Sequence, residues 1–127
     1  MLISILKSKI HRATVTDANI NYKGSITIDK ELLEHAKIRA FERVTVASID
    51  SGERLETYVI EGKRGSGEVC LNGAAAQKIL KGDKIIIMAF ALIEENDADK
   101  FKPVIIHVDN GNKIISEENH PEANEEC

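Results

Sequence analysis

The chain has 127 residues, enough for one domain with a modest hydrophobic core. Hydrophobic residues make up 43% and charged residues 30%, ordinary values for a globular protein, and the longest apolar run, residues 85–93, is too short to span a membrane. Of the 21 acidic and 17 basic residues, six acidic residues and one basic residue follow Val108, so the preceding part is nearly neutral. This balance argues against a general nucleic-acid binder, which would carry a marked basic excess.

The cysteines, the histidines and the N-terminus restrict the compartment and the cofactors. Cys70 and Cys127 form neither a C-x-x-C pair nor a disulfide framework, as is typical of a reducing compartment. At the N-terminus a very short apolar stretch precedes the first lysine, which is the wrong order for a secretory signal. We therefore expect a cytoplasmic protein without membrane attachment. The four histidines lack the H-x-x-x-H spacing of metal ligands, so we expect no metal site.

The predicted elements are mainly short strands. They occupy residues 2–12, 14–16, 19–22, 25–28, 44–49, 54–60, 68–71, 84–93 and 104–108. Two short helices are expected, one from a cap at Asp29 to about Lys37 and one over residues 74–80. So many short strands in a small chain imply a closed or nearly closed β-barrel. We expect residues 1–108 to form this domain and residues 109–127 to form an acidic tail.

Side-chain alternation assigns polar residues to faces of two strands. In the first strand, if it is regular, one face carries Lys7, Lys9 and His11. In the strand over residues 54–60, Arg54 and Tyr58 project from one face and Thr57 from the other. An arginine and a tyrosine on one face could bind a carboxylate and donate a proton. An exposed arginine beside a half-buried tyrosine is nevertheless the commoner explanation of such a pair.

Gly24-Ser25 lies between two predicted strands, where a simple hairpin turn is the commoner explanation. The pair also allows a specific reaction. The Ser25 hydroxyl can attack the Gly24 carbonyl and convert the peptide bond into an ester, and glycine tolerates the strained backbone that this rearrangement needs. Elimination from the ester would leave a dehydroalanine, which hydrolyses to a pyruvoyl group at the new N-terminus. The dipeptide alone does not decide between the turn and the cleavage site.

Two glycine-containing segments also have alternative explanations. Residues 62–67, Gly-Lys-Arg-Gly-Ser-Gly, could hold a phosphate through backbone N–H groups. They lack the G-x-x-x-x-G-K-[ST] order, however, and a flexible loop that crosses the barrel fits better. Residues 72–76, Asn-Gly-Ala-Ala-Ala, could let a ligand approach the backbone, and N–H groups at a helix start favour an anion. Helix propensity explains the three alanines equally well.

Five segments in this order resemble the aspartate 1-decarboxylase family of pantothenate biosynthesis, over roughly residues 1–108. They are Lys9-Ile-His-Arg12, Tyr22-Lys-Gly-Ser25, Arg54 with Thr57-Tyr58, Arg64-Gly-Ser66 and Asn72-Gly-Ala-Ala-Ala76. Each segment alone is a weak signal, whereas the ordered set is specific. The resemblance implies a mainly β double-psi β-barrel with short helices and a homotetramer with active sites between subunits. It also implies self-cleavage into a β chain, residues 1–24, and an α chain, residues 25–127.

The same resemblance implies an enzyme that decarboxylates L-aspartate to β-alanine and CO2. Cleavage between Gly24 and Ser25 would turn Ser25 into a covalent pyruvoyl cofactor, and Tyr58 would be the proton donor. The resemblance also implies that Thr57, Gly73, Ala74 and Ala75 contact substrate and that Lys9 and Arg54 bind its carboxylates. Thr57 and Asn72 would assist processing. His11 and Tyr22 would lie near the pocket. Because alternation puts Thr57 opposite Tyr58, a bulge or a neighbouring subunit must reconcile their roles.

Two other functions stay open at this point. A non-enzymatic barrel that binds a protein partner or nucleic acid would share the fold, although the nearly neutral body and the ordered motifs count against it. Another pyruvoyl enzyme would decarboxylate a different amino acid, although the two cations favour aspartate. The sequence also leaves open whether maturation needs a helper protein. A solvated terminus is the simplest description of the acidic tail, and a binding role is an alternative.

Overall fold

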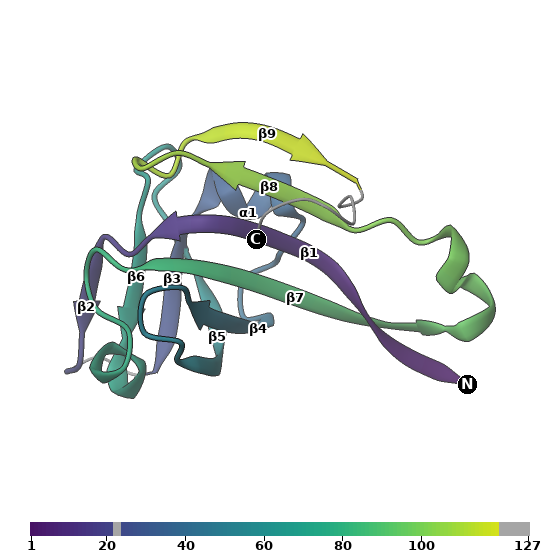
Figure 1. Cartoon of the computed structure of the whole chain (residues 1–127), viewed down its shortest axis with the longest axis horizontal. Coiled ribbons are helices and arrows are strands. Elements are labelled where there is room, and N and C mark those ends of the chain that lie inside the picture. Colours follow the sequence, from purple (N-terminus) through teal and green to yellow (C-terminus); the bar gives the residue numbers. More distant parts are fainter. Residues whose placement is uncertain (22–23, 120–127) are drawn as a thin grey trace.

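The computed structural model describes residues 1–21 and 24–119. The strands are β1 (Leu2–Thr14), β2 (Asp17–Asn19), β3 (Ser25–Asp29), β4 (Arg43–Ser48), β5 (Arg54–Gly62), β6 (Val69–Asn72), β7 (Lys84–Glu94), β8 (Val104–Val108) and β9 (Ile114–Glu118). The helical elements are α1 (Lys30–Ala36) and the 3-10 segments η1 (Gly73–Gln77) and η2 (Glu95–Lys100). The strands join in the order β2-β6-β3-β5-β4-β7-β1-β8-β9 (Figure 1). The predicted class, mainly β and barrel-like with short helices, is confirmed.

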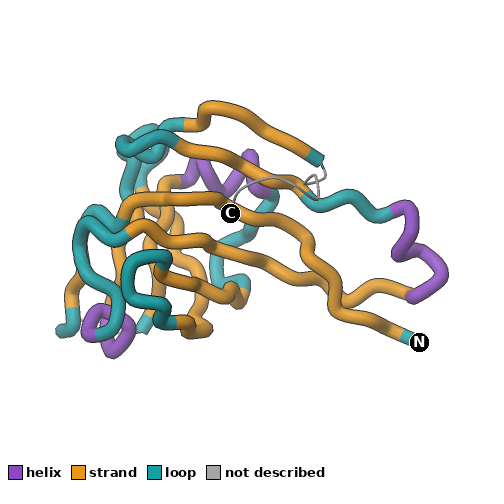
Figure 2. The backbone as a smooth tube through the Cα atoms, in the orientation of Figure 1, coloured by secondary structure: helices purple, strands orange, loops and turns teal. Residues whose placement is uncertain are grey.

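Buried side chains from distant strands explain why this sheet curls around a core. Ile26 and Ile28 of β3 and Ile85 and Ile87 of β7 are all completely buried, and they belong to one hydrophobic cluster. Strands β5 and β4 separate β3 from β7 in the sheet order. Inner faces so far apart in a sheet share one core when the sheet wraps around it, and Figure 2 shows this wrapping.

β1 and β7 form a long antiparallel ribbon that extends beyond the rest of the sheet (Figure 1). The outer part of the ribbon pairs residues 2–6 with residues 90–94. Several apolar side chains there are exposed, with accessible fractions of 57% for Leu2, 45% for Phe90 and 69% for Leu92. Clustered apolar exposure of this kind commonly marks a surface that another protein molecule covers.

Asp29 joins the first helix to the glycine-rich loop between β5 and β6. Its Oδ1 accepts a hydrogen bond from the Glu31 N–H at 2.8 Å, which confirms the predicted helix cap. The same carboxylate accepts from the Gly65 N–H at 2.9 Å and from the Gly67 N–H at 2.8 Å. These N–H groups, which a phosphate would need, therefore bind an internal carboxylate. The loop is tied to α1 and β3 and is not the loose crossing that the sequence predicted.

β1 is longer than predicted and is irregular. Its pairing with β7 shifts register between Leu6 and Ser8 and again between Ile10 and Ala13. The second shift contains Arg12, whose φ of 65° lies in the left-handed region. Lys7 and Lys9 are half-buried, whereas His11 is buried with 4% of its surface accessible. The expectation that the three residues share one face applied only to a regular strand. The register shift at residue 7 breaks that regularity, whereas the continuous pairing of residues 8–11 with β8 keeps Lys9 and His11 on one face.

The helix predicted over residues 74–80 is shorter and tighter in the structure, where η1 covers residues 73–77. Its end has a local cause. The N–H groups of Lys78 and Ile79 both donate to the Ala75 carbonyl, at 3.1 and 3.2 Å, so the segment closes after little more than one turn. Helix propensity of the alanines is too weak to extend such a segment.

A further strand, β9, lies within the residues expected to form the acidic tail. It pairs with β8 in an antiparallel arrangement. Two histidine–glutamate contacts accompany this pairing: the Glu118 carboxylate lies 3.5 Å from His107 Nε2, and the Glu117 carboxylate lies 3.3 Å from His35 Nδ1. These long-range contacts explain how a polar, glutamate-rich segment is held as an edge strand. Residues 120–127 of the predicted tail lie outside the described residues.

Candidate active site

Strands β3 and β6 bring Ser25 and Asn72 together from positions 47 residues apart. Ser25 is the first residue of β3, is 1% exposed, and pairs directly with Asn72 at the end of β6. The Asn72 Nδ2 group donates to Ser25 Oγ at 2.9 Å and to Thr27 Oγ1 at 3.1 Å. Asn72 Oδ1 accepts from the Cys70 thiol at 3.4 Å. The predicted nucleophile is thus buried in a polar cluster that fixes its hydroxyl oxygen.

Gly24 precedes this cluster in an open environment. Among the residues that the structure describes, an added Cβ at Gly24 would meet no atom within 4 Å. Crowding by the described residues therefore does not require glycine at position 24. Tyr22, which the resemblance places near the pocket, lies outside the described residues.

A cavity of about 260 Å³ opens beside the cluster. It is lined by the predicted site residues Gly24, Thr57, Ala74 and Ala75 and by Leu55, Glu56 and Lys78. The small η1 side chains leave room next to the backbone, and Gly73 turns the chain into η1 with a φ of 73°. A cavity of this size suits a molecule of a few heavy atoms, and Lys78 supplies a cation at its wall.

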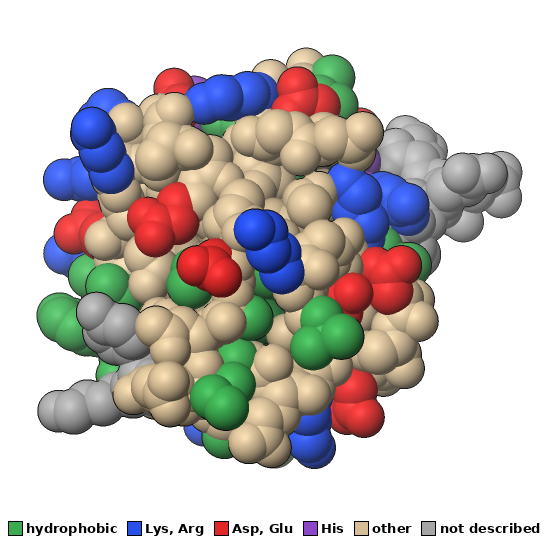
Figure 3. All heavy atoms as spheres, turned by 90° about the vertical axis from the view of Figure 1, so that its left-hand side faces the viewer, with side chains coloured by type: hydrophobic (Ala, Val, Ile, Leu, Met, Phe, Trp, Pro, Cys, Tyr) green, Lys and Arg blue, Asp and Glu red, His purple; other side chains and the backbone are tan. Residues whose placement is uncertain are grey.

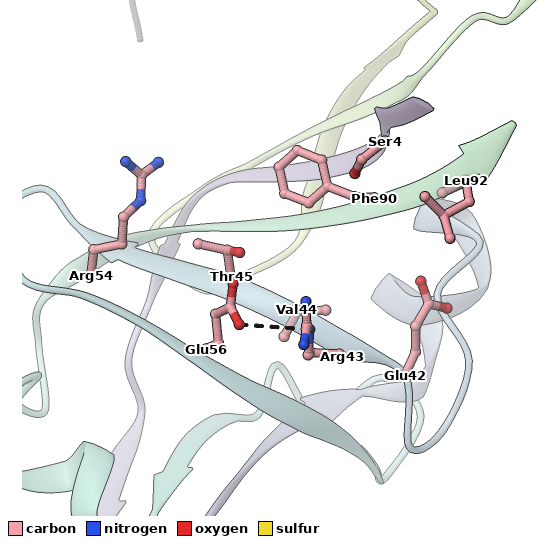
Figure 4. A pocket seen from close by; sticks show the side chains of 10 residues that line it. Ser4, Glu42, Arg43, Val44, Thr45, Arg54, Glu56, Phe90 and Leu92 are labelled. Atoms are coloured by element: carbon pink, nitrogen blue, oxygen red, sulfur yellow. Dashed lines mark ion pairs between the residues drawn. The ribbon is translucent and has the colours of Figure 1, made fainter. Parts of the chain in front are cut away.

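Arg54 and Tyr58 lie on the opposite face of β5 from Thr57. The β4–β5 pairing runs from Arg43–Tyr58 to Ala47–Arg54 in continuous register, so alternation is strict over this stretch. Arg54 lines a second cavity of about 690 Å³, which lies between β4, β5 and the β1–β7 ribbon (Figure 4). No bulge in this stretch brings Thr57 and Tyr58 to one face.

Lys9 and His11 lie on β1, which β4 and β7 separate from β5 in the sheet. Lys9 pairs with Met88 on one side and Ile105 on the other. The buried His11 ring lies edge-on to the His107 ring, with 5.2 Å between their centroids. Neither residue lines the two cavities described above. One chain therefore gathers the cleavage and small-residue positions and leaves Lys9, Arg54 and Tyr58 elsewhere on its surface.

Thr27 and Cys70 contact the site although the sequence analysis did not assign them to it. Thr27 shares the face of Ser25 by alternation, so its position was within reach of a strand argument. The contact of Cys70 with Asn72 is harder to predict from the sequence, because it depends on the orientation of the Asn72 side-chain amide. Burial, followed by the charges of Asp17 and Glu68, raises the pKa of the Cys70 thiol.

The surface around the site mixes apolar and charged groups. At the end of the molecule that carries η1, Figure 3 shows hydrophobic side chains exposed between basic and acidic ones. Ile20 and Leu80 belong to the exposed apolar residues, with accessible fractions of 54% and 58%. Within the described ranges, no cluster of His, Cys, Asp and Glu could hold a metal ion, and no helix is long and apolar enough to cross a membrane.

Fold and site together define a small, mainly β protein in which a buried, amide-bound serine follows a glycine beside a small cavity. The chain belongs to the aspartate decarboxylase family, whose model matches residues 1–115. It is 57% identical over 125 residues to the aspartate 1-decarboxylase of Caldicellulosiruptor saccharolyticus, covering 98% of both chains. It is 57% identical to the aspartate 1-decarboxylase of Clostridium botulinum strain Langeland, with 90% of each covered, and 54% identical to that of Clostridium kluyveri, with 91% of each covered.

Proposed function

We propose that this chain is the precursor of a pyruvoyl-dependent enzyme that decarboxylates L-aspartate to β-alanine for pantothenate synthesis in the cytoplasm. One observation carries the proposal. In a member of the aspartate decarboxylase family, Ser25 directly follows a glycine, and its buried hydroxyl oxygen accepts a hydrogen bond from Asn72. A hairpin turn by itself would not require a buried serine in an organised polar cluster.

Self-cleavage uses the chain's own atoms. Ser25 Oγ attacks the Gly24 carbonyl carbon, its proton moves to the departing amide nitrogen, and an ester replaces the peptide bond. Loss of the Cα proton of residue 25 then expels the Gly24 carboxylate and leaves a dehydroalanine. Water hydrolyses this group to a pyruvoyl ketone and releases ammonia. The Asn72 N–H donates to the oxygen that becomes the nucleophile, a contact that stabilises negative charge as the hydroxyl proton leaves.

The residues near the cleavage site fit a pyruvoyl group at position 25. Small η1 side chains and Gly73 leave space beside it, and Thr57 lies at the wall of the same cavity. When formed, the group supplies an electron sink for decarboxylation of an amino acid. Arg54 and Lys9 would bind the two carboxylates of aspartate and orient it. Tyr58 would return a proton to the carbon that loses CO2.

We propose further that the active enzyme is a homotetramer whose sites lie between subunits. The continuous β5 register supports this, because Arg54 and Tyr58 face away from the cavity that holds Thr57. A second copy of the chain would bring its Arg54–Tyr58 face to the cleavage site of the first copy. The exposed apolar ribbon and the apolar side chains near η1 supply surfaces for such contacts.

The intact mass of the purified protein under denaturing conditions tests this proposal. We expect two chains split after Gly24, the larger of which lacks the amino group of an N-terminal serine. A full-length chain would be warmed for a prolonged period and incubated with cell extract, because a helper protein for maturation is a further part of the proposal. A wild-type chain that stays whole through both treatments contradicts the proposal.

Ser25→Ala is the matched control, because it keeps the chain intact and removes the nucleophilic oxygen. We expect no cleavage and no β-alanine from this variant under any of the conditions. A panel of amino acids given to the cleaved wild-type protein then checks the substrate. Faster CO2 release from another amino acid than from aspartate would contradict the assignment of substrate while leaving the cleavage chemistry intact.

A further inference from the structure

Both polar atoms of the Asn72 side-chain amide, Nδ2 and Oδ1, have hydrogen-bond partners. Its Nδ2 group has two hydrogens, and these go to Ser25 Oγ at 2.9 Å and Thr27 Oγ1 at 3.1 Å. Its Oδ1 faces Cys70 Sγ at 3.4 Å. Thr27 and Cys70 are themselves directly paired across the β3–β6 ladder. The Asn72 amide, which contacts the predicted nucleophile Ser25, is therefore also hydrogen-bonded to Thr27 and Cys70, two neighbouring side chains on adjacent strands.

An asparagine amide can adopt two orientations that differ by exchange of its oxygen and nitrogen. Hydroxyl groups do not choose between them, because serine and threonine both donate and accept. A protonated thiol favours the orientation with the amide oxygen toward the sulfur, because the thiol donates a weak hydrogen bond and is a poorer acceptor. The alternative partner of the Cys70 thiol, the Leu71 carbonyl, is more distant at 3.8 Å. Cys70 therefore favours the orientation with Oδ1 toward itself and Nδ2 toward Ser25.

One feature keeps the Cys70 thiol a hydrogen-bond donor, and a second directs the Thr27 hydroxyl toward Asn72. Burial raises the pKa of the Cys70 thiol, and the charges of Asp17 and Glu68 add to the effect, so sulfur keeps its proton at neutral pH. The Thr27 methyl group lies beside Gly62 of β5, because a Cβ added at Gly62 would lie 3.2 Å from Thr27 Cγ2. With the methyl group on that side, the hydroxyl lies toward Asn72.

We propose that Thr27 and Cys70 are positioning residues for self-cleavage. Cys70 selects the orientation in which the Asn72 N–H group donates to Ser25 Oγ, and Thr27 holds the second hydrogen of that group. This inference rests on the proposed function, because it concerns the rate of the cleavage step. In this orientation the Ser25 oxygen accepts a hydrogen from Asn72, and Asn72 does not compete for the Ser25 hydroxyl proton. In the exchanged orientation the Asn72 oxygen would instead compete for that proton and would repel charge on Oγ.

Two matched pairs of variants test the inference. Cys70→Ala removes the donor, whereas Cys70→Ser keeps a donor of similar size. Thr27→Val removes the hydroxyl without a change in shape, whereas Thr27→Ser keeps it. Cleavage of freshly refolded precursor is followed by mass, and the melting temperature of each precursor is measured in parallel. We expect roughly five- to tenfold slower cleavage for Cys70→Ala and Thr27→Val, the effect of losing one modest hydrogen bond. Thr27→Ser should cleave within about twofold of wild type. Cys70→Ser should cleave at a rate between those of Cys70→Ala and wild type, because its hydroxyl can donate to Asn72 Oδ1 but, unlike the thiol, accepts equally well.

The outcomes separate a positioning role from a structural one. Wild-type rates in both Cys70→Ala and Thr27→Val overturn the inference and leave the proposed function standing. Equally slow cleavage in Thr27→Val and Thr27→Ser, or slower cleavage in Cys70→Ser than in Cys70→Ala, also overturns it, because hydrogen bonding to the Asn72 amide would then not set the rate. If the wild-type chain never cleaves, the proposed function fails. NMR of the Asn72 side-chain amide in the uncleaved precursor tests the contact itself: its signals should shift in Cys70→Ala, and unchanged signals would contradict the inference.

Discussion

The Asn72 side-chain amide donates a hydrogen bond to the Ser25 hydroxyl across the β3–β6 pair, at 2.9 Å. Both residues are almost completely buried, with 6% and 1% of their surfaces exposed. In such surroundings a hydrogen bond to an atom that develops charge is stronger than the same bond in water. The bond therefore connects the architecture of the sheet to the chemistry proposed for residue 25.

Asn72→Ala should slow self-cleavage by about ten- to a hundredfold, because hydrogen bonds to charged groups contribute about 1.5–3 kcal/mol. The rate is measured by mass spectrometry of precursor that is refolded from denaturant. The variant also leaves the hydroxyls of Ser25 and Thr27 without their amide donor, so its melting temperature is recorded to separate loss of folding from loss of rate. A folded Asn72→Ala precursor that cleaves as fast as wild type would show that the amide has no part in the reaction.

Tyr58→Phe should cleave normally but decarboxylate aspartate roughly a hundredfold more slowly, the usual scale for loss of a general acid. Tyr58 pairs with Arg43 on the face of β5 that points away from Thr57, so its hydroxyl is not expected to affect processing in its own chain. Mass gives the extent of cleavage, and β-alanine formation gives turnover. Normal turnover by the cleaved variant would remove Tyr58 as the proton donor.

Asp29→Asn should lower the free energy of unfolding at pH 7 by about 1–3 kcal/mol, because an amide nitrogen would then face backbone N–H groups. Burial raises the pKa of Asp29, but hydrogen bonds from Gly67, Glu31 and Gly65, together with the charge of Lys113, outweigh it and lower the pKa below its ordinary value. A lowered folded-state pKa gives stability that is fully present above the unfolded-state pKa, about 3.9, and is lost as pH falls through the folded-state value.

The wild-type protein should therefore lose stability as the pH falls below about 4, and Asp29→Asn should lose less over the same range. Urea unfolding at a series of pH values measures this difference. Asp99→Asn, which changes an exposed carboxylate of η2, is the matched control and should follow the wild-type curve. Equal acid sensitivity of wild type and Asp29→Asn would contradict the role of Asp29 in holding the glycine-rich loop.

Asn112→Ala should destabilise the fold by about 2–3 kcal/mol, although the sequence analysis assigned this residue to the tail. The Asn112 side chain is 1% exposed and accepts from the Thr14 N–H at 2.8 Å. It also donates to the Thr14 carbonyl at 2.9 Å and to the Gly67 carbonyl at 2.8 Å. Urea unfolding measures the change, with the exposed Asn96→Ala as the control. Equal stability of the two variants would show that the segment after Val108 does not anchor the domain.

The sequence by itself determined the elements whose cause is local. The Asp29 cap, the helix after it, the hairpin of β4 and β5 and the alternation within β5 were all predicted, and the structure agrees. These features depend on side chains a few residues apart, so propensity and period suffice to find them. The family was likewise visible in the ordered motifs around Ser25 and Asn72, and the comparisons confirm it.

Tertiary structure decided what depends on strands that are distant in sequence. Three contacts illustrate this: the pairing of Ser25 with Asn72, the contact of the Cys70 thiol with Asn72, and the hydrogen bond from the Gly67 N–H to Asp29. No helical or strand periodicity in the sequence predicts them. The same holds for β9, in which only Ile114 and Ile115 have strong strand propensity and which pairs with β8 beside His107. In these cases the free energy of a contact comes from partners that folding supplies, so a local pattern carries no signal for it.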